Sequence, residues 1–150
     1  VQRSFLTKLG DTEQQAFLDF NFAPTCLRRD IAILGLLHKR VIGQSHPAFE
    51  CLLPFWSERF GTSRGVGHSK PLYGHWAEAT HHRSLYAKSI FMMIDIYNNL
   101  PQNVVDSVNV SCFQKLLTER ARERCRADDP LWASCFSSRS VDSDELAPLD

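Results

Sequence analysis

Long apolar runs and strand patterns are both lacking in this sequence. No stretch of about 18 uncharged apolar residues occurs, so no membrane-spanning helix is expected. The first ten residues do not form a secretory signal, because Lys8 interrupts a short apolar stretch. Apolar and polar residues almost never alternate as they do in strands, and no internal repeat is present. These absences favour a helical protein outside the membrane.

Signatures of familiar catalytic and metal sites are lacking as well. The glycines of 61–67 are not followed by the lysine of a phosphate-binding loop, and no GxSxG motif occurs. Four histidines between residues 68 and 82 have spacings that fit no common metal site, and no CxxC pair supports them. We therefore predict neither a metal nor a cofactor for this chain. The four are His68, His75, His81 and His82.

Five cysteines occur at wide spacings, and their odd number gives no disulfide framework. This pattern is typical of reduced thiols in an intracellular protein, of the nucleus or the cytoplasm, and we expect most of them to fill the core. They are Cys26, Cys51, Cys112, Cys125 and Cys135.

The composition is that of a folded chain with unevenly placed charge. The 150 residues are 43% apolar and 23% charged, which suits one packed domain or part of a larger protein. Residues 25–90 carry nine Lys/Arg against four Asp/Glu, a net charge of +5, whereas residues 91–150 carry six against ten, a net charge of −4. The basic middle either faces an anionic partner such as nucleic acid or is an ordinary solvated surface.

Helix signals begin at the first residue. Residues 1–9 read as a helix that starts without a cap, as expected if the chain continues upstream. Thr12 and Gln15 then match a capping box for a helix over 13–20.

The strongest helix is predicted over 25–43, where apolar residues recur at helical spacing and Gly43 suits the end. His38 lies on its apolar face, and we interpret it as a neutral, hydrogen-bonded core residue. Four cations follow two stripes of this helix and are the candidate phosphate contacts, with a solvated amphipathic face as the alternative. They are Arg28, Arg29, Lys39 and Arg40.

The second half of the chain contains further helix signals. A short helix is predicted between Pro47 and Pro54, followed by a Gly/Ser-rich loop near 61–76. Ser84 can cap a nearly all-apolar, buried helix over 85–98, which leaves Asn98 in a thin polar seam.

The end of the chain carries the last of these signals. Ser111 and Gln114 match a second capping box, whose helix turns charged after residue 118 and should project into solvent. A last short helix is expected over 129–136. We predict an all-α fold, an irregular bundle of five to seven helices that forms one region over 1–136, with a disordered acidic tail over 137–150.

Three blocks of sequence resemble one known family. "VQRSFLTKLG" at 1–10 is similar to the helix that follows the polymerase core in non-LTR (LINE-type) retrotransposon reverse transcriptases, and "RRDIAILGLLHKRVIG" at 28–43 is similar to a segment further downstream. Residues 89–117 resemble the family's terminal pattern, S-[FI]-F…-[WY]-N-x-LP…VV…-S-V-x-x-F-x-x-x-L. Its most distinctive positions here are Tyr97, Asn98, Leu100, Pro101 and Phe113.

The resemblance implies a non-catalytic C-terminal region of an RNA-directed DNA polymerase. The polymerase aspartates of the family's [FY]-x-D-D turn are not in this sequence, so Mg²⁺ would belong to a polymerase core elsewhere. The endonuclease and the cysteine-histidine knuckle of some relatives are also missing. The implied partners are an upstream polymerase domain of the same chain and an RNA/DNA template-primer. The alternatives are a standalone helical protein-interaction domain and an inactive retroelement remnant.

Overall fold

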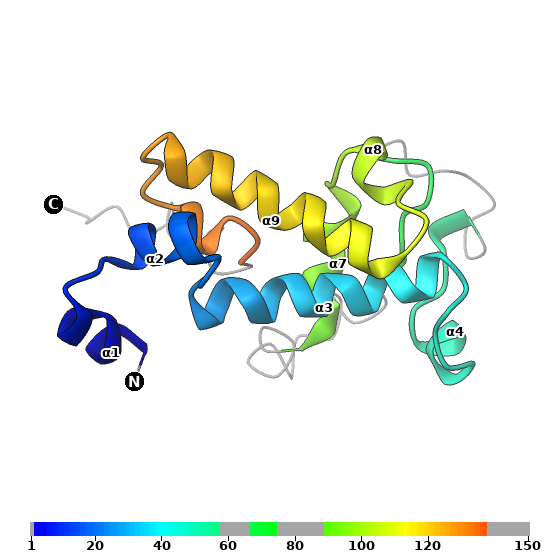
Figure 1. Cartoon of the computed structure of the whole chain (residues 1–150). Coiled ribbons are helices and arrows are strands. Elements are labelled where there is room, and N and C mark those ends of the chain that lie inside the picture. Colours follow the sequence, from blue (N-terminus) through cyan, green and yellow to red (C-terminus); the bar gives the residue numbers. More distant parts are fainter. Residues whose placement is uncertain (1, 58–66, 75–88, 138–150) are drawn as a thin grey trace, which may run out of the picture. The chain divides into compact units, whose positions relative to one another are not determined.

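The computed structural model describes residues 2–57, 67–74 and 89–137, and this part of the chain is all-α, as predicted (Figure 1). The only β feature in these ranges is an isolated antiparallel bridge between Phe55 and Leu72. None of the helices described is long and apolar enough to cross a membrane. The described elements are α1 (Gln2–Leu9), α2 (Glu13–Phe20), α3 (Thr25–Val41), α4 (Ala48–Leu52), η3 (Ile90–Met92), α7 (Met93–Asn98), α8 (Gln102–Val105), α9 (Val110–Arg126) and η4 (Trp132–Ser134), where η denotes a 3-10 helix.

The chain divides into two compact units. The first unit comprises Val1–Ile31 and Leu117–Asp150, and the second unit comprises Ala32–Leu116. The division falls within α3 and within α9, so each long helix contributes residues to both units. The sequence had predicted a single helical region over 1–136.

The first unit confirms the predicted start of α2. The Thr12 hydroxyl accepts a hydrogen bond from the Gln15 amide at 3.1 Å, and the Gln15 side chain accepts one from the Thr12 amide at 3.1 Å. These reciprocal bonds satisfy backbone donors that the first helical turn leaves without partners. Asn21, in the left-handed region at φ 55°, ends the helix after Phe20.

An aromatic stack forms the centre of the first unit. The Phe17 and Trp132 rings lie 5.3 Å apart and are nearly parallel, and the Arg122 guanidinium lies 5.6 Å from the Phe17 ring centroid. Ala121 and Cys125 are fully buried. The charged end of α9 therefore does not project into solvent as predicted, because one small-residue face of it is packed in this core.

The C-terminal end of α9 is closed by α2. Asp128 has φ 55°, and the Asp129 amide donates back to the Arg124 carbonyl, so the helix ends in a left-handed residue. The Gln14 side chain donates to the Cys125 carbonyl at 2.9 Å and to the Asp128 carboxylate at 2.8 Å. The predicted last helix is present as the short η4, and Ser137, placed in the predicted tail, is buried. Residues 138–150 lie outside the described part.

In the second unit, the predicted ends of α3 and α4 are confirmed, whereas the predicted starts of two later helices are wrong. Gly43, at φ 71°, ends α3, and α4 lies between Pro47 and Pro54. However, Ser89 is extended and caps η3, so the predicted continuous helix over 85–98 is wrong, and Ser84 lies outside the described residues.

The second capping box is also wrong. The Asn109 carboxamide accepts a hydrogen bond from the Cys112 amide at 2.8 Å, so α9 begins one residue before Ser111. The α8 helix, which the sequence analysis did not predict, follows Pro101 directly.

Part of the predicted Gly/Ser-rich loop packs into the second unit. Residues 67–74 are described, and within them Leu72 is fully buried. The Tyr73 amide donates to the Pro54 carbonyl at 2.8 Å, and the Ser69 amide donates to the Gln102 side chain at 2.8 Å. This stretch is therefore a fixed part of the unit, whereas 61–66 and 75–76 lie outside the described residues.

The Asn98 side chain joins this segment to α7. Its Oδ1 accepts from the Leu72 amide, and its Nδ2 donates to the Leu72 carbonyl, both at 2.9 Å. The amide thus bonds the Leu72 backbone as a neighbouring strand would. Asn98 is 2% exposed, so its predicted place in a polar seam is corrected.

We expect Asn98→Ala to lower the free energy of unfolding by about 3 kcal/mol, because two buried backbone groups of Leu72 would lose their partners. Urea unfolding measures the change. The control is Asn99→Ala, at the exposed neighbouring position, where we expect a change within about 0.5 kcal/mol. Equal losses for the two variants would contradict the role given to Asn98.

Candidate functional site

The predicted phosphate contacts lie on α3, and three of the four are exposed. Arg28 and Arg29 belong to the first unit, and Lys39 belongs to the second. The Arg28 guanidinium lies 5.4 Å from the Phe22 ring centroid, which leaves its hydrogen-bond donors available for an anion. Arg28 and Lys39 are thus the less constrained cations of this set.

Arg29 is exposed and also forms an ion pair with Asp30. Its Nε and Nη2 both donate to Oδ1 of Asp30, at 3.1 and 3.0 Å. Asp30 is buried, so this contact keeps a carboxylate charge compensated inside the first unit. Arg29 therefore has a structural partner and still presents part of its guanidinium to solvent.

Arg40 does not fit the prediction. It is 8% exposed, its Nε donates to the Leu53 carbonyl at 3.1 Å, and its guanidinium lies 4.4 Å from the Phe55 ring centroid. Arg40 thus binds the segment after α4 to α3 and is not available to a phosphate. Sequence periodicity placed it on a polar stripe because its partners come from later in the chain.

His38 is the neutral core histidine that the sequence predicted. Its Nε2 lies 3.0 Å from the Ser107 carbonyl, which only accepts, so Nε2 carries the proton. Its Nδ1, 3.1 Å from the Tyr97 hydroxyl, therefore accepts from that hydroxyl. The ring also stacks on Phe113 with centroids 4.1 Å apart. Every hydrogen-bonding atom of this imidazole has a partner.

His68 forms a second satisfied imidazole in the same unit. Its Nε2 donates to the Tyr97 carbonyl at 3.0 Å, and its Nδ1 accepts from the Lys70 amide at 3.1 Å. Gly67 is in the left-handed region at φ 70°, and a Cβ there would lie 2.1 Å from the Asn98 carbonyl oxygen. In the sequence His68 appeared to belong with the other histidines, because Tyr97, the partner that fixes its buried position, lies 29 residues away and leaves no local signal.

The residues of the C-terminal pattern meet around these histidines. Tyr97 and Phe113 are fully buried, with ring centroids 5.9 Å apart, and Leu100 is buried as well. Pro101, extended at φ −68° and ψ 152°, separates α7 from α8. Tyr97 and Phe113 cluster with Asn98 and the two histidines. We call this cluster the polar hub, and its members are His38, His68, Tyr97, Asn98 and Phe113. The hub holds the unit together and exposes no reactive group.

Histidines and cysteines do not assemble into a metal site in the described residues. No group of three potential ligands comes together there, and His75, His81 and His82 lie outside that part of the chain. All five cysteines are described, and none is in a disulfide. Three of them are exposed (Cys26, Cys51 and Cys112), so the prediction that most fill the core is wrong.

Comparison with known proteins finds no counterpart for this chain. No family model, no curated protein and no solved structure matches it.

We expect the stability of the protein to fall as the pH drops below about 6.5. Burial lowers the pKa of His38 and His68, outweighing the opposing effect of their bonds to backbone carbonyls. The unfolded chain then binds more protons than the folded chain, so the free energy of unfolding decreases with falling pH, by up to about 1.4 kcal/mol per pH unit for each histidine.

Urea unfolding between pH 5.0 and 7.5 measures this dependence, and NMR titration of the ring protons assigns it. His38 and His68 should titrate below the ordinary histidine pKa of about 6.5, because burial disfavours their charged forms. Titration of both buried histidines at or above pH 6.5 would contradict the lowering of their pKa by burial.

Proposed function

We propose that this chain is the non-catalytic helical C-terminal region of a LINE-type reverse transcriptase. The observation that carries the proposal is the structural use of the family-like pattern around residues 97–113. Each of its distinctive positions is either buried in the second unit or separates two of its helices. This is what we expect of a pattern whose role is to specify the fold. Buried rings and satisfied amides support a scaffold role, because they offer no nucleophile or acid-base pair to a substrate.

DNA synthesis would then rest on a polymerase core and its Mg²⁺, with this chain packed beside it. Two-metal phosphoryl transfer needs carboxylates held together, and the sequence has no [FY]-x-D-D turn. Among the described residues, the buried carboxylate is that of Asp30, and it is paired with Arg29. The chain's contribution to polymerisation would therefore be to support the core and to hold nucleic acid.

Template-primer contact would come from the exposed cations of α3. Arg28, Arg29 and Lys39 each present a positive group to solvent, and such groups bind phosphates without reading the base sequence. Arg40 is left out of this set because its guanidinium is buried against Phe55.

We expect the triple variant Arg28→Gln/Arg29→Gln/Lys39→Gln to bind an RNA/DNA hybrid duplex more weakly. The slope of log affinity against log salt concentration should become shallower by up to about 3, because up to three phosphate contacts are lost. Fluorescence anisotropy of a labelled duplex at several salt concentrations measures both quantities.

The matched control makes the same change in charge elsewhere. Lys8→Gln/Lys115→Gln/Arg126→Gln removes three exposed cations outside α3. An unchanged salt slope in the α3 variant, or an equal change in the control, would remove α3 from the interface. Absence of binding by the unaltered chain would exclude this nucleic-acid role.

A second candidate, a helical protein-interaction domain, is favoured by exposed apolar side chains of the first unit. Phe5 and Leu9 are one turn apart on α1 and both more than half exposed, and Phe20 at the end of α2 is 73% exposed. A contiguous patch of such side chains would suit a surface that another polypeptide covers. In the preferred function, that polypeptide is the polymerase domain.

We expect the isolated chain to self-associate, because the apolar side chains of Phe5 and Phe20 are in water without a partner domain. Sedimentation velocity should show larger species that Phe5→Ser/Phe20→Ser reduces, whereas Val108→Ser, at an exposed apolar position of the second unit, should not. A monodisperse chain that melts cooperatively would instead support a self-contained module.

A further inference from the structure

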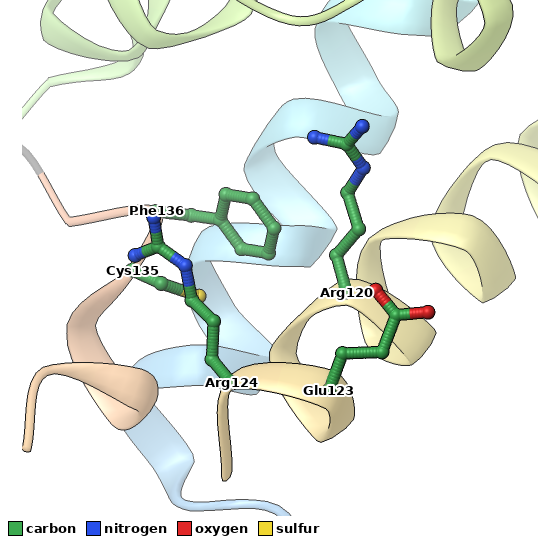
Figure 2. A pocket seen from close by; sticks show the side chains of 5 residues that line it. All are labelled: Arg120, Glu123, Arg124, Cys135 and Phe136. Carbon is green, nitrogen blue, oxygen red and sulfur yellow. The ribbon is translucent and has the colours of Figure 1, made fainter. Parts of the chain in front are cut away.

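A small pocket in the first unit is distinct from the α3 cations, from the polar hub and from the exposed apolar side chains of α1 and α2. Its volume is about 190 Å³, and Figure 2 shows the five side chains that line it. Three come from the last turns of α9, and two follow η4 in the chain. The lining residues are Arg120, Glu123, Arg124, Cys135 and Phe136.

Two arginines give the pocket its charge. Arg120 and Arg124 are four residues apart on α9, so both lie on one face of the helix. In Figure 2 their guanidinium groups lie on either side of the Phe136 ring, whereas the Glu123 carboxylate is not directed at that ring. The spacing was available in the sequence, but only the fold adds an aromatic wall to it.

Neither arginine is held by a strong partner. Arg124 lies 3.7 Å from the Asp129 carboxylate, and both side chains of this pair are partly exposed. No carboxylate of the described residues pairs with Arg120. Exposed ion pairs contribute roughly 0–1 kcal/mol to stability, so Arg124 can exchange this contact for a better one. A phosphate would give it two parallel hydrogen bonds.

The rest of the pocket is uncharged. Phe136 is a mostly buried ring, and Cys135 is half-buried. Burial raises the pKa of the Cys135 thiol to about 11, against the opposing effect of Arg124, so the thiol is neutral at physiological pH. The pocket is thus lined by two exposed cations and an apolar wall, and only Glu123 among its lining residues is anionic.

We propose that this pocket binds the phosphate of a nucleoside monophosphate or of a nucleic-acid terminus, with the exposed Arg120 and Arg124 side chains reorienting onto the phosphate from either side of the Phe136 ring and that ring against the attached sugar or base. Guanidinium groups match phosphate oxygens in geometry, and an aromatic ring favours a flat neighbour. The pocket is smaller than those that enclose drug-sized ligands, so it would hold the phosphate and the group next to it and leave the rest of the ligand outside. The proposal does not depend on the α3 interface.

Cys135 provides a reporter for this site in the unaltered chain. We expect adenosine 5′-monophosphate to slow alkylation of Cys135 by iodoacetamide at least fivefold at saturation, because the ligand would cover the thiol. Mass spectrometry of the peptides measures the rate, and exposed Cys51 and Cys112 should react unchanged in the same samples. Adenosine without phosphate and inorganic phosphate are the comparison ligands, and each should protect less.

Variants test the two arginines separately. Arg120→Gln and Arg124→Gln should each raise the half-protecting concentration about tenfold or more, as expected for loss of a charge-assisted hydrogen bond. Arg126→Gln, which removes an exposed cation of the same helix outside the pocket, should leave it unchanged. Circular dichroism and melting temperature establish that each variant is folded.

Three outcomes would overturn the proposal. The first is no protection of Cys135 by the monophosphate, and the second is equal loss of protection with Arg126→Gln. The third is full protection by inorganic phosphate alone, which would mean that Phe136 selects no nucleotide. A 5′-phosphorylated oligonucleotide distinguishes the two sources, because protection stronger than that by the monophosphate would identify a nucleic-acid terminus as the ligand.

Discussion

Buried polar groups at the centre of the second unit are stable only because each of them has a partner inside that unit. The Asn98 amide bonds both backbone groups of Leu72, and the two histidines each bond a carbonyl and a donor. Apart from the bond that the Lys70 amide donates to His68, these bonds join residues that are 26 to 69 positions apart in the chain. The path of residues 67–74 and the position of α7 follow from this requirement.

The same requirement explains why the polar hub looks like an active site in composition and not in geometry. It contains two histidines and a tyrosine, which are common catalytic residues. Yet the Tyr97 hydroxyl donates to His38, and burial raises the pKa of Tyr97, so neither group is available to a substrate. A neutral, satisfied imidazole stabilises a core, whereas catalysis needs one with an atom facing a cavity. The hub therefore supports a scaffold role.

Positive charge is presented differently by the two long helices. On α3 the cations are exposed along the helix, which suits non-specific contact with a phosphate backbone. On α9 two arginines border a pocket with an aromatic wall, which suits a single phosphorylated group. The exposed apolar side chains of α1 and α2 suit contact with protein instead. These three surfaces are chemically distinct, so each can be tested without the others.

Local signals in the sequence determined the helical class and several helix ends. Thr12 with Gln15, Gly43 and the pair Pro47 and Pro54 act on backbone within a few residues, so their effect is readable without a fold. The apolar periodicity of 25–43 likewise identified the buried face of α3 and the neutral His38.

Only the tertiary structure decided which polar residues are buried and which surfaces are formed. Arg40 and Asn98 looked solvent-facing by periodicity, but each is fixed by a backbone group from another segment. Asn109, and not Ser111, caps α9, because its side-chain oxygen accepts from the Cys112 amide. The pocket beside Phe136 requires the chain after η4 to return to α9. Such contacts depend on residues far apart in sequence, and no short pattern records them.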